Sequence, residues 1–295
     1  MVNLSAVKLC WRPHSHNEPS LDKILPPLLI SVEQTDSKAL RCIYQLCNEK
    51  NKDNRIPMLC HNGWDVLSPL LKCLHCKEKE TVRQLALLTL ANLSIPMENK
   101  AIMALGHLSQ EILSVLYKII HEEAPEAYLA CICLVNLSFL GDAIEPLFFF
   151  SFSNSCNNTS TSLGHEFSGY HIMEQIIQKC GVLPGTQSPE SEAVRWLYVL
   201  IKNITNTKRI CSTIARTKIP FHIIRLLNST QQPLLKWTSG SIEDSSLKIL
   251  LNLSKWKESK EQLIQCNTSQ VIQPFVGKEG IHGYRASVIQ LSLTS

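Results

Sequence analysis

The stretch that decides the fold is Val82-Arg-Gln-Leu-Ala-Leu-Leu-Thr-Leu-Ala-Asn92-Leu-Ser94, an apolar run that ends in an Asn-Leu-Ser motif. Similar runs recur downstream and also end in Asn-x-Ser or Asn-x-Thr. A weaker upstream copy, Ala39–Cys47, has Gln45 in place of the asparagine. Self-similarity of this kind is the sequence signature of a repeat architecture. The four clear copies are marked by Asn92, Asn136, Asn203 and Asn252.

Successive markers, counted from Gln45, are 47, 44, 67 and 49 residues apart. Helical repeats of the HEAT and armadillo kinds have periods of roughly 40–47 residues. The long interval contains the polar run Ser151-Phe-Ser-Asn-Ser-Cys-Asn-Asn-Thr-Ser-Thr-Ser162, which predicts an inserted loop near residues 150–169. The phenylalanines at 148–150, just before this run, are suited to packing into the core.

The residues between two markers follow one plan. After Asn92 an apolar stretch reaches Leu105, Gly106 interrupts it, and apolar residues then return at helical spacing from Ile112 to Ile120. Pro125 then opens the next marked run, where a proline in the first helical turn is tolerated. Each unit is therefore predicted to be a short helix, a bend, a second helix, and a third helix that ends in the motif.

This pattern resembles the armadillo repeat family, because the marker asparagine follows a small residue by six positions at Ala86 and Ala130. The resemblance implies an all-α fold, a right-handed superhelical solenoid of three-helix repeats. It covers residues 20–265, about five units, after an N-terminal tail at 1–19. Residues 266–295 are expected to form a partial repeat or a cap.

One repeat cannot bury its apolar stripe alone, so neighbouring repeats stack and the third helices line up along one concave surface. Residues four and seven positions before each marker share its helix face. In peptide-binding armadillo proteins the marker asparagines bind an extended peptide, and the resemblance implies that role here. The predicted peptide-binding residues are Asn92, Asn136, Asn203, Asn252, Leu88, Ile132, Val199, Trp196 and Lys248, with Leu85, Leu129 and Ser245 as further neighbours.

A structural role for the asparagines competes with this prediction, since asparagine also caps helix C-termini and adopts left-handed conformations. Apolar side chains at helical spacing are also more often core than ligand site. Importin-alpha-like armadillo proteins carry Trp four residues before the marker. Here those positions hold Leu88, Ile132, Val199 and Lys248, so a groove for basic nuclear-localisation peptides is not supported.

Charge and composition limit the function classes. The net charge of +4 is too small to indicate a nucleic-acid partner, and the sequence contains no stretch of about 18 apolar residues. Twelve cysteines scattered through apolar helical pattern, with no apparent signal peptide, indicate reduced thiols in a cytoplasmic or nuclear protein.

Positive charge is concentrated in the C-terminal half. Residues 190–260 carry 12 lysines and arginines against five acids. This excess either favours an acidic partner segment or is simply a solvated basic face. The residues predicted to form the basic surface are Lys202, Lys208, Arg209, Lys255 and Lys257.

Signals for catalysis or metal binding are weak. Cys73-Leu-His75-Cys76 offers three potential zinc ligands, but a structural site needs four, usually as two spaced pairs. The sequence has no phosphate-binding loop and no hydrolase or metalloprotease motif. We therefore expect no enzyme, cofactor or metal. The leading hypothesis is a protein-binding adaptor or scaffold; the alternatives are a nucleocytoplasmic transport receptor and a non-catalytic subunit of a larger complex.

Overall fold

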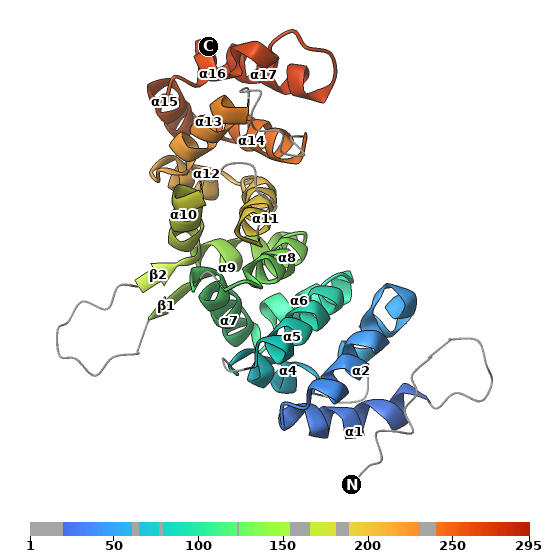
Figure 1. Cartoon of the computed structure of the whole chain (residues 1–295). Helices are drawn as coiled ribbons and strands as arrows, with labels where there is room; N and C mark the ends of the chain where they lie inside the picture. The colour runs from blue at the N-terminus through green and yellow to red at the C-terminus, as the bar shows by residue number, and fades with distance from the viewer. Residues whose placement is uncertain are drawn as a thin grey trace, which may run out of the picture. The chain divides into compact units, whose positions relative to one another are not determined.

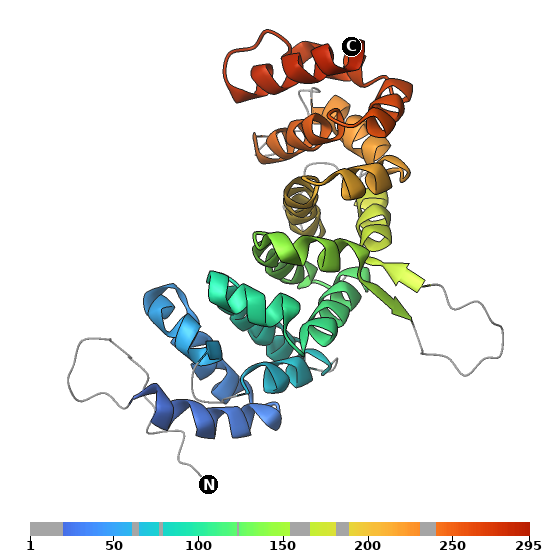
Figure 2. The ribbon, with the colours of Figure 1, turned by 180° about the vertical axis from the view of Figure 1, so that it is seen from behind.

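The computed structural model describes residues 20–60, 65–76, 79–122, 124–153, 166–180, 189–230 and 240–295. These residues form a succession of helices joined by short turns, together with two short strands (Figure 1 and, from behind, Figure 2). The chain divides into unit 1, Met1–Ile119, and unit 2, Ile120–Ser295. No helix in the described ranges has both the length and the apolar character needed to cross a bilayer.

Unit 1 is built around α5 (Glu80–Leu93), which carries the decisive motif and packs against α2 (Ser37–Cys47) and α4 (Leu67–Leu74). Leu87 and Leu90 of α5 are fully buried, and Ala86 is buried beside them, where its small side chain allows close approach of the neighbouring helices. The remaining helices of unit 1 are α1 (Leu21–Glu33), η2 (Glu49–Asn54), α3 (Arg55–Cys60), α6 (Met97–Leu105) and most of α7 (Ser109–His121).

Unit 2 repeats the same arrangement. Along its length α8 (Ala127–Leu137) packs on α11 (Pro189–Ile204), α11 on α14 (Gly240–Leu253), and α14 on α17 (Ile281–Thr294). The other helices of unit 2 are η3 (Gly141–Ala143), α9 (Ile144–Phe149), α10 (Gly169–Cys180), α12 (Lys208–Ala215), α13 (Ile219–Thr230), α15 (Lys257–Gln265), α16 (Thr268–Ile272) and η4 (Gln273–Phe275).

The predicted fold class is confirmed: the chain is an all-helical repeat solenoid, apart from one short β-hairpin. We call α2, α5, α8, α11, α14 and α17 the marked helices, since each ends at or near a copy of the motif. The bend predicted at Gly106 is also present, where α6 ends. A Cβ atom at this position would lie only 2.2 Å from the carbonyl oxygen of Ile102, so only glycine fits.

The hairpin lies at the insertion. Strand β1 (Ser151–Ser153) pairs antiparallel with β2 (Glu166–Ser168). The predicted loop therefore begins and ends in two paired strands. Phe148 is fully buried and stacks on Tyr170 at 5.3 Å between ring centroids. The phenylalanines before the insertion thus anchor it to the core. The rest of the polar run, up to Ser162, lies within residues 154–165, which are outside the described residues, as is the predicted tail at 1–19.

The C-terminal residues continue the repeat plan. Helices α15, α16 and α17 follow the marker of α14 in the order predicted for one unit, and the predicted boundary at residue 265 falls at the end of α15. In α17, Ala286 precedes Ser292-Leu293-Thr294 by six positions, the spacing of Ala86 to Asn92. Ser292 therefore occupies the marker position of this helix.

Candidate functional site

The marked helices expose the same position in successive repeats. The residue four positions before the marker is half-buried in most of them, although its neighbours along the helix are largely buried. In each unit this position forms the centre of what we call the marked face. Its residues are Leu88 in α5, Ile132 in α8, Val199 in α11, Lys248 in α14 and Val288 in α17; Arg41, the equivalent in α2, is exposed.

The residue seven positions before the marker follows this pattern only in part. Leu85, Trp196 and Arg285 are half-buried and extend the marked face. Leu129 and Ser245 are buried, 3% and 1% exposed, so the prediction that they border a binding surface is wrong. Both side chains are part of the packing between repeats, because at these points the helix turns that position toward the core.

The marker residues link neighbouring repeats by hydrogen bonds. Asn203 donates from Nδ2 to the hydroxyl of Ser138 at 3.0 Å. Asn252 donates in the same way to Oγ1 of Thr205 at 3.4 Å. Ser292, the marker of α17, donates to the carbonyl oxygen of Ser254 at 2.7 Å. In unit 2 each marker from α11 onward therefore contacts the motif of the preceding repeat.

The serine or threonine of the motif makes this link possible. The hydroxyl of Ser138 donates to the carbonyl oxygen of Val135 at 2.6 Å, which leaves its lone pairs free to accept the amide of Asn203. Thr205 does the same with Lys202 at 3.2 Å. The markers are also not left-handed caps, because Thr35 and Asn267 are the non-glycine residues with positive φ in the described ranges. The left-handed cap is therefore wrong, and the structural role that Asn203 and Asn252 show is a link between repeats.

The marker asparagines differ in exposure. Asn203 is half-buried, whereas Asn252 is only 5% exposed and its Oδ1 accepts a hydrogen bond from Lys255 at 3.2 Å. Asn92 and Asn136 are half-buried at the same position of their helices. Asn203 thus borders the marked face and, like Asn252, also holds neighbouring repeats together.

The predicted basic surface separates into two places. Lys202 and Lys255 lie on α11 and just after α14, on the side of the marked helices, close to Lys248. Lys208, Arg209 and Lys257 lie on the first helices of their repeats, α12 and α15.

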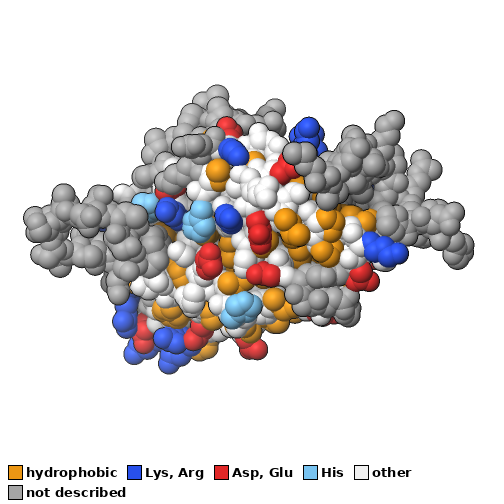
Figure 3. Space-filling model, turned by 90° about the horizontal axis from the view of Figure 1, so that it is seen from below, with side chains coloured by type: hydrophobic (Ala, Val, Ile, Leu, Met, Phe, Trp, Pro, Cys, Tyr) orange, Lys and Arg blue, Asp and Glu red, His pale blue; other side chains and the backbone are white. Residues whose placement is uncertain are grey.

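Arg209 already has two partners within unit 2. It pairs with Glu145 at 2.7 Å and stacks over the ring of Phe149 at 4.4 Å from the centroid. Seen from the α1 end, charges of both signs mix with hydrophobic side chains (Figure 3). In the α11–α14–α17 region, Lys202, His282 and Arg285 gather around one acid.

That acid is Asp244 of α14. Its carboxylate oxygens lie 3.9 Å from Nζ of Lys202 and 3.7 Å from Nε2 of His282, and it accepts a hydrogen bond from Arg285. Sequence reasoning missed Arg285 and His282 because the motif of α17 lacks asparagine. The spacing from Ala286 to Ser292 could have revealed the register and placed Arg285 seven positions before the marker.

Lys248 lies at the centre of this arrangement. Its pKa is lowered, first by burial of its ammonium group and then by the positive charges of Lys255, Arg285 and Lys202, while Asp244 acts in the opposite direction. Lys202 and Arg285 each pair with Asp244. Among the described residues, Lys248 and Lys255 are the cations of this cluster that have no carboxylate partner. The cluster is therefore an under-neutralised positive site.

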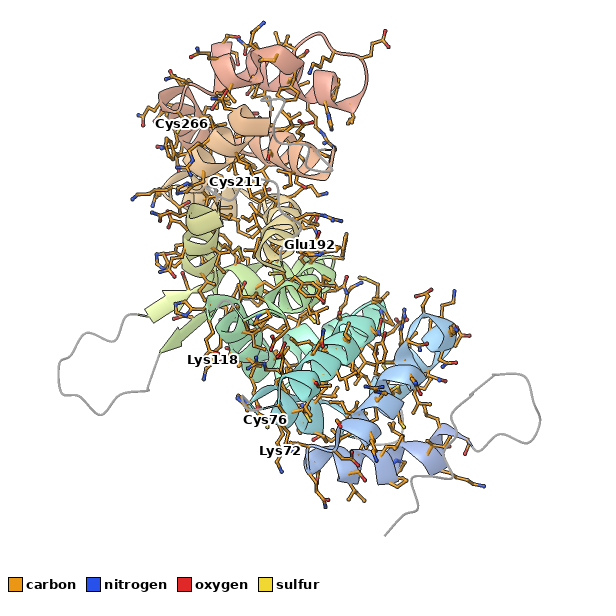
Figure 4. The ribbon with its side chains drawn as sticks, in the orientation of Figure 1. Lys72, Cys76, Lys118, Glu192, Cys211 and Cys266 are labelled. Carbon is orange, nitrogen blue, oxygen red and sulfur yellow. The ribbon has the colours of Figure 1, made fainter. Side chains whose placement is uncertain are left out.

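The cysteines have structural surroundings. Cys211, labelled in Figure 4, donates toward the carbonyl oxygens of Thr205 and Asn252 at 3.7 and 3.9 Å. Burial raises the pKa of Cys211 to about 11 and that of Cys133 to about 12. Thiols with such pKa values carry little thiolate at neutral pH and are poor nucleophiles.

The Cys73-Leu-His75-Cys76 group has separate contacts. The buried thiol of Cys73 donates toward the carbonyl oxygen of Val32 at 3.5 Å, whereas Nε2 of His75 lies 3.8 Å from a carboxylate oxygen of Glu111. Within the described ranges, no three His, Cys, Asp or Glu side chains are grouped so as to hold a metal ion.

Comparisons with known proteins concern the fold. No protein-family model and no curated protein matches the sequence. A chain from a structure of the interaction between cadherin and beta-catenin matches with a TM-score of 0.69 at 14% identity, over 94% of this chain but only 53% of that one. Two engineered proteins match with TM-scores of 0.65 and 0.67, each at 14% identity, over 94% and 91% of this chain and 97% and 57% of theirs. At such identities the likeness establishes that this chain has a helical repeat fold.

Proposed function

We propose that this protein is a non-enzymatic adaptor or scaffold that binds a segment of a partner protein along the marked face. The observation that carries this proposal is the repeated exposure of the position four residues before the marker. Leu88, Ile132 and Val199 place apolar side chains there, half-buried beside an asparagine amide. An apolar contact next to an amide donor and acceptor suits an extended peptide, whose backbone needs both.

The comparison with the cadherin and beta-catenin structure supports the same proposal, since that fold was solved in the context of a protein–protein interaction. The finer assignment, an armadillo-type array, rests on the three-helix plan and on the marker spacing. A cytoplasmic or nuclear location is part of the proposal and rests on the cysteine-rich core, which suits a reducing compartment.

A transport receptor for basic peptides is the weaker alternative. Such a receptor needs aromatic stacking surfaces and acidic side chains opposite its ligand. The marked face of unit 2 instead offers Val199, Lys248 and the cations around Asp244. Like charges across an interface disfavour a basic partner.

A capture experiment tests the proposal. The double variant Ile132→Ser/Val199→Ser removes apolar contact from the marked face without removing a side-chain hydrogen bond. The matched control, Phe221→Ser/Ile264→Ser, changes apolar residues that are 51% and 53% exposed on α13 and α15. We expect the first variant to lose the captured partner and the control to retain it, with both still helical by circular dichroism. Equal capture by both variants would place binding elsewhere.

A second candidate, a structural subunit of a larger complex, has one observation in its favour. Ile281, Tyr284 and Leu291 of α17 lie three and seven residues apart, so they form one helical stripe, and they are 54%, 64% and 70% exposed. An exposed apolar stripe of this kind marks an interaction surface. Val288 of the marked face lies on the same stripe, so the two candidates are separated by a pair of variants: Ile132→Ser/Val199→Ser should lose the partner segment but retain assembly through α17, whereas Tyr284→Lys/Leu291→Lys should abolish that assembly.

A further inference from the structure

The cation cluster on the marked face of unit 2 specifies the chemistry of the partner. We propose that Lys248 and Lys255, together with Lys202, bind the carboxylates of an acidic, extended segment of the partner protein. This inference rests on the proposed function, because it assigns a ligand class to part of the same face.

The cluster is continuous across three repeats. Lys202 comes from the end of α11, Lys248 from the middle of α14 and Lys255 from the turn after α14, while Arg285 comes from α17. Among the described residues, the charges that act on Lys248 are those of Lys255, Arg285, Lys202 and one acid, Asp244.

The single acid is largely occupied by other residues. Arg285 donates both to the carboxylate and to the main-chain carbonyl of Asp244, and His282 lies on the same carboxylate oxygen as Arg285. Lys202 approaches the other oxygen at 3.9 Å. Asp244 thus forms its ion pairs with Arg285, His282 and Lys202, and its effect on Lys248 is opposed by the positive charges of Lys255, Arg285 and Lys202.

The other acids of α11 and α14 whose side chains the structure describes do not neutralise the pair. Glu192, at the start of α11 (Figure 4), binds Arg195 at 3.2 Å. Glu243 is half-buried on α14, next to Asp244, and is not among the charges that act on Lys248. Burial and mutual repulsion of the ammonium groups both disfavour the charged form of Lys248, and an incoming carboxylate would relieve the repulsion.

The ligand is a protein segment because the cluster borders hydrogen-bonding and apolar groups. Asn252 lies between the two lysines, with its Oδ1 bound to Lys255, and Val199 and Trp196 flank the cluster on α11. Packed helices lie roughly 8–10 Å apart and an extended chain rises about 3.3 Å per residue. Carboxylates two or three residues apart in the partner would therefore reach cations on neighbouring marked helices.

The test uses the full chain and a defined probe. A fluorescein-labelled peptide of alternating Glu and Ser is titrated with the protein, and its anisotropy is followed. The peptide with Gln in place of Glu serves as the neutral probe. The protein variant is Lys248→Gln/Lys255→Gln. The matched control is Lys208→Gln/Lys257→Gln, which removes the same charge from exposed positions on α12 and α15.

We expect the acidic peptide to bind the parent protein more tightly than the neutral peptide does. The Lys248→Gln/Lys255→Gln variant should weaken binding about tenfold, because the charge contacts of the half-buried Lys248 and the exposed Lys255 are both lost, and the control should change it less than about twofold. Equal weakening by both variants would mean unspecific attraction to net charge and would overturn the proposal. Unchanged binding to both variants would also overturn it, as would tighter binding of a labelled oligonucleotide than of the acidic peptide at the same site.

Failure of this inference and failure of the proposed function give different results. If the partner captured through Ile132 and Val199 is still captured by the Lys248→Gln/Lys255→Gln variant, the marked face binds a segment without carboxylates at this cluster. If the Ile132→Ser/Val199→Ser variant captures the partner normally, the proposed function itself fails.

Discussion

The hydrogen bond from Asn203 to Ser138 offers a quantitative test of how repeats are joined. The two side chains belong to consecutive motifs and meet at 3.0 Å in a partly buried position. A hydrogen bond between neutral groups contributes about 0.5–1.5 kcal/mol net, and an unsatisfied buried partner costs about 1–3 kcal/mol. We therefore expect Asn203→Ala to lower the free energy of unfolding by roughly 1–2 kcal/mol.

The double-mutant cycle isolates the contact. We expect Ser138→Ala and Asn203→Ala to be coupled by about 1 kcal/mol, whereas residues without a shared partner add to within about 0.5 kcal/mol. Urea denaturation followed by circular dichroism, under conditions where unfolding is a single transition, measures each free energy. The pair Ser138→Ala and Asn252→Ala is the control, since Asn252 contacts Thr205 instead. Additive effects of Ser138→Ala and Asn203→Ala would refute the link between repeats.

Three further predictions concern stability and reactivity. Gly106→Ala should destabilise unit 1 by about 1–3 kcal/mol in thermal or urea unfolding, because its Cβ would lie 2.2 Å from a backbone oxygen; an unchanged midpoint would show that the α6–α7 bend can relax. Burial lowers the pKa of His222, so the unfolded chain binds more protons and stability should fall as pH drops below about 6.5. His222→Leu should remove that dependence in unfolding curves recorded from pH 7.5 downward. Iodoacetamide should modify the exposed Cys60 well before Cys133, whose pKa burial raises to about 12; equal rates by mass spectrometry would contradict the buried assignment.

The sequence predicts the repeat well because its signal is local. The marker asparagine lies one residue before the end of α5, α8, α11 and α14, and in α5 and α8 it follows a small residue within two turns of the same helix, so these helix ends follow from the local pattern. The bend at Gly106 is local in the same sense.

The features that could not be predicted depend on contacts between helices. The pairing of Asp244 with Arg285 joins residues 41 positions apart, and neither residue lies in a sequence motif that predicts this contact. Whether a residue seven positions before the marker faces solvent or core depends on the rotation of each helix in its stack. Trp196 is half-buried, but Ser245, at the same position one repeat later, is buried.

The role of the asparagines shows the same limit. The sequence indicated that the asparagines either cap helices or contact a ligand. The structure shows a third role for Asn203 and Asn252, which donate hydrogen bonds to the hydroxyl group of the preceding motif. That role is visible only when two repeats are placed side by side. Replacing these asparagines therefore perturbs stability as well as any binding, and Val199 and Lys248 are the better positions at which to test binding alone.

The most direct test of the central claim is site-specific photo-cross-linking. A benzophenone amino acid is placed at Val199 on the marked face and, as the control, at Phe221, which is 51% exposed on α13. The cross-linked partner peptide is then identified by mass spectrometry after irradiation in cell extract. We expect one partner segment to attach at position 199 and none at position 221. Attachment at position 221 but not at 199 would contradict the claim that the marked face is the binding surface.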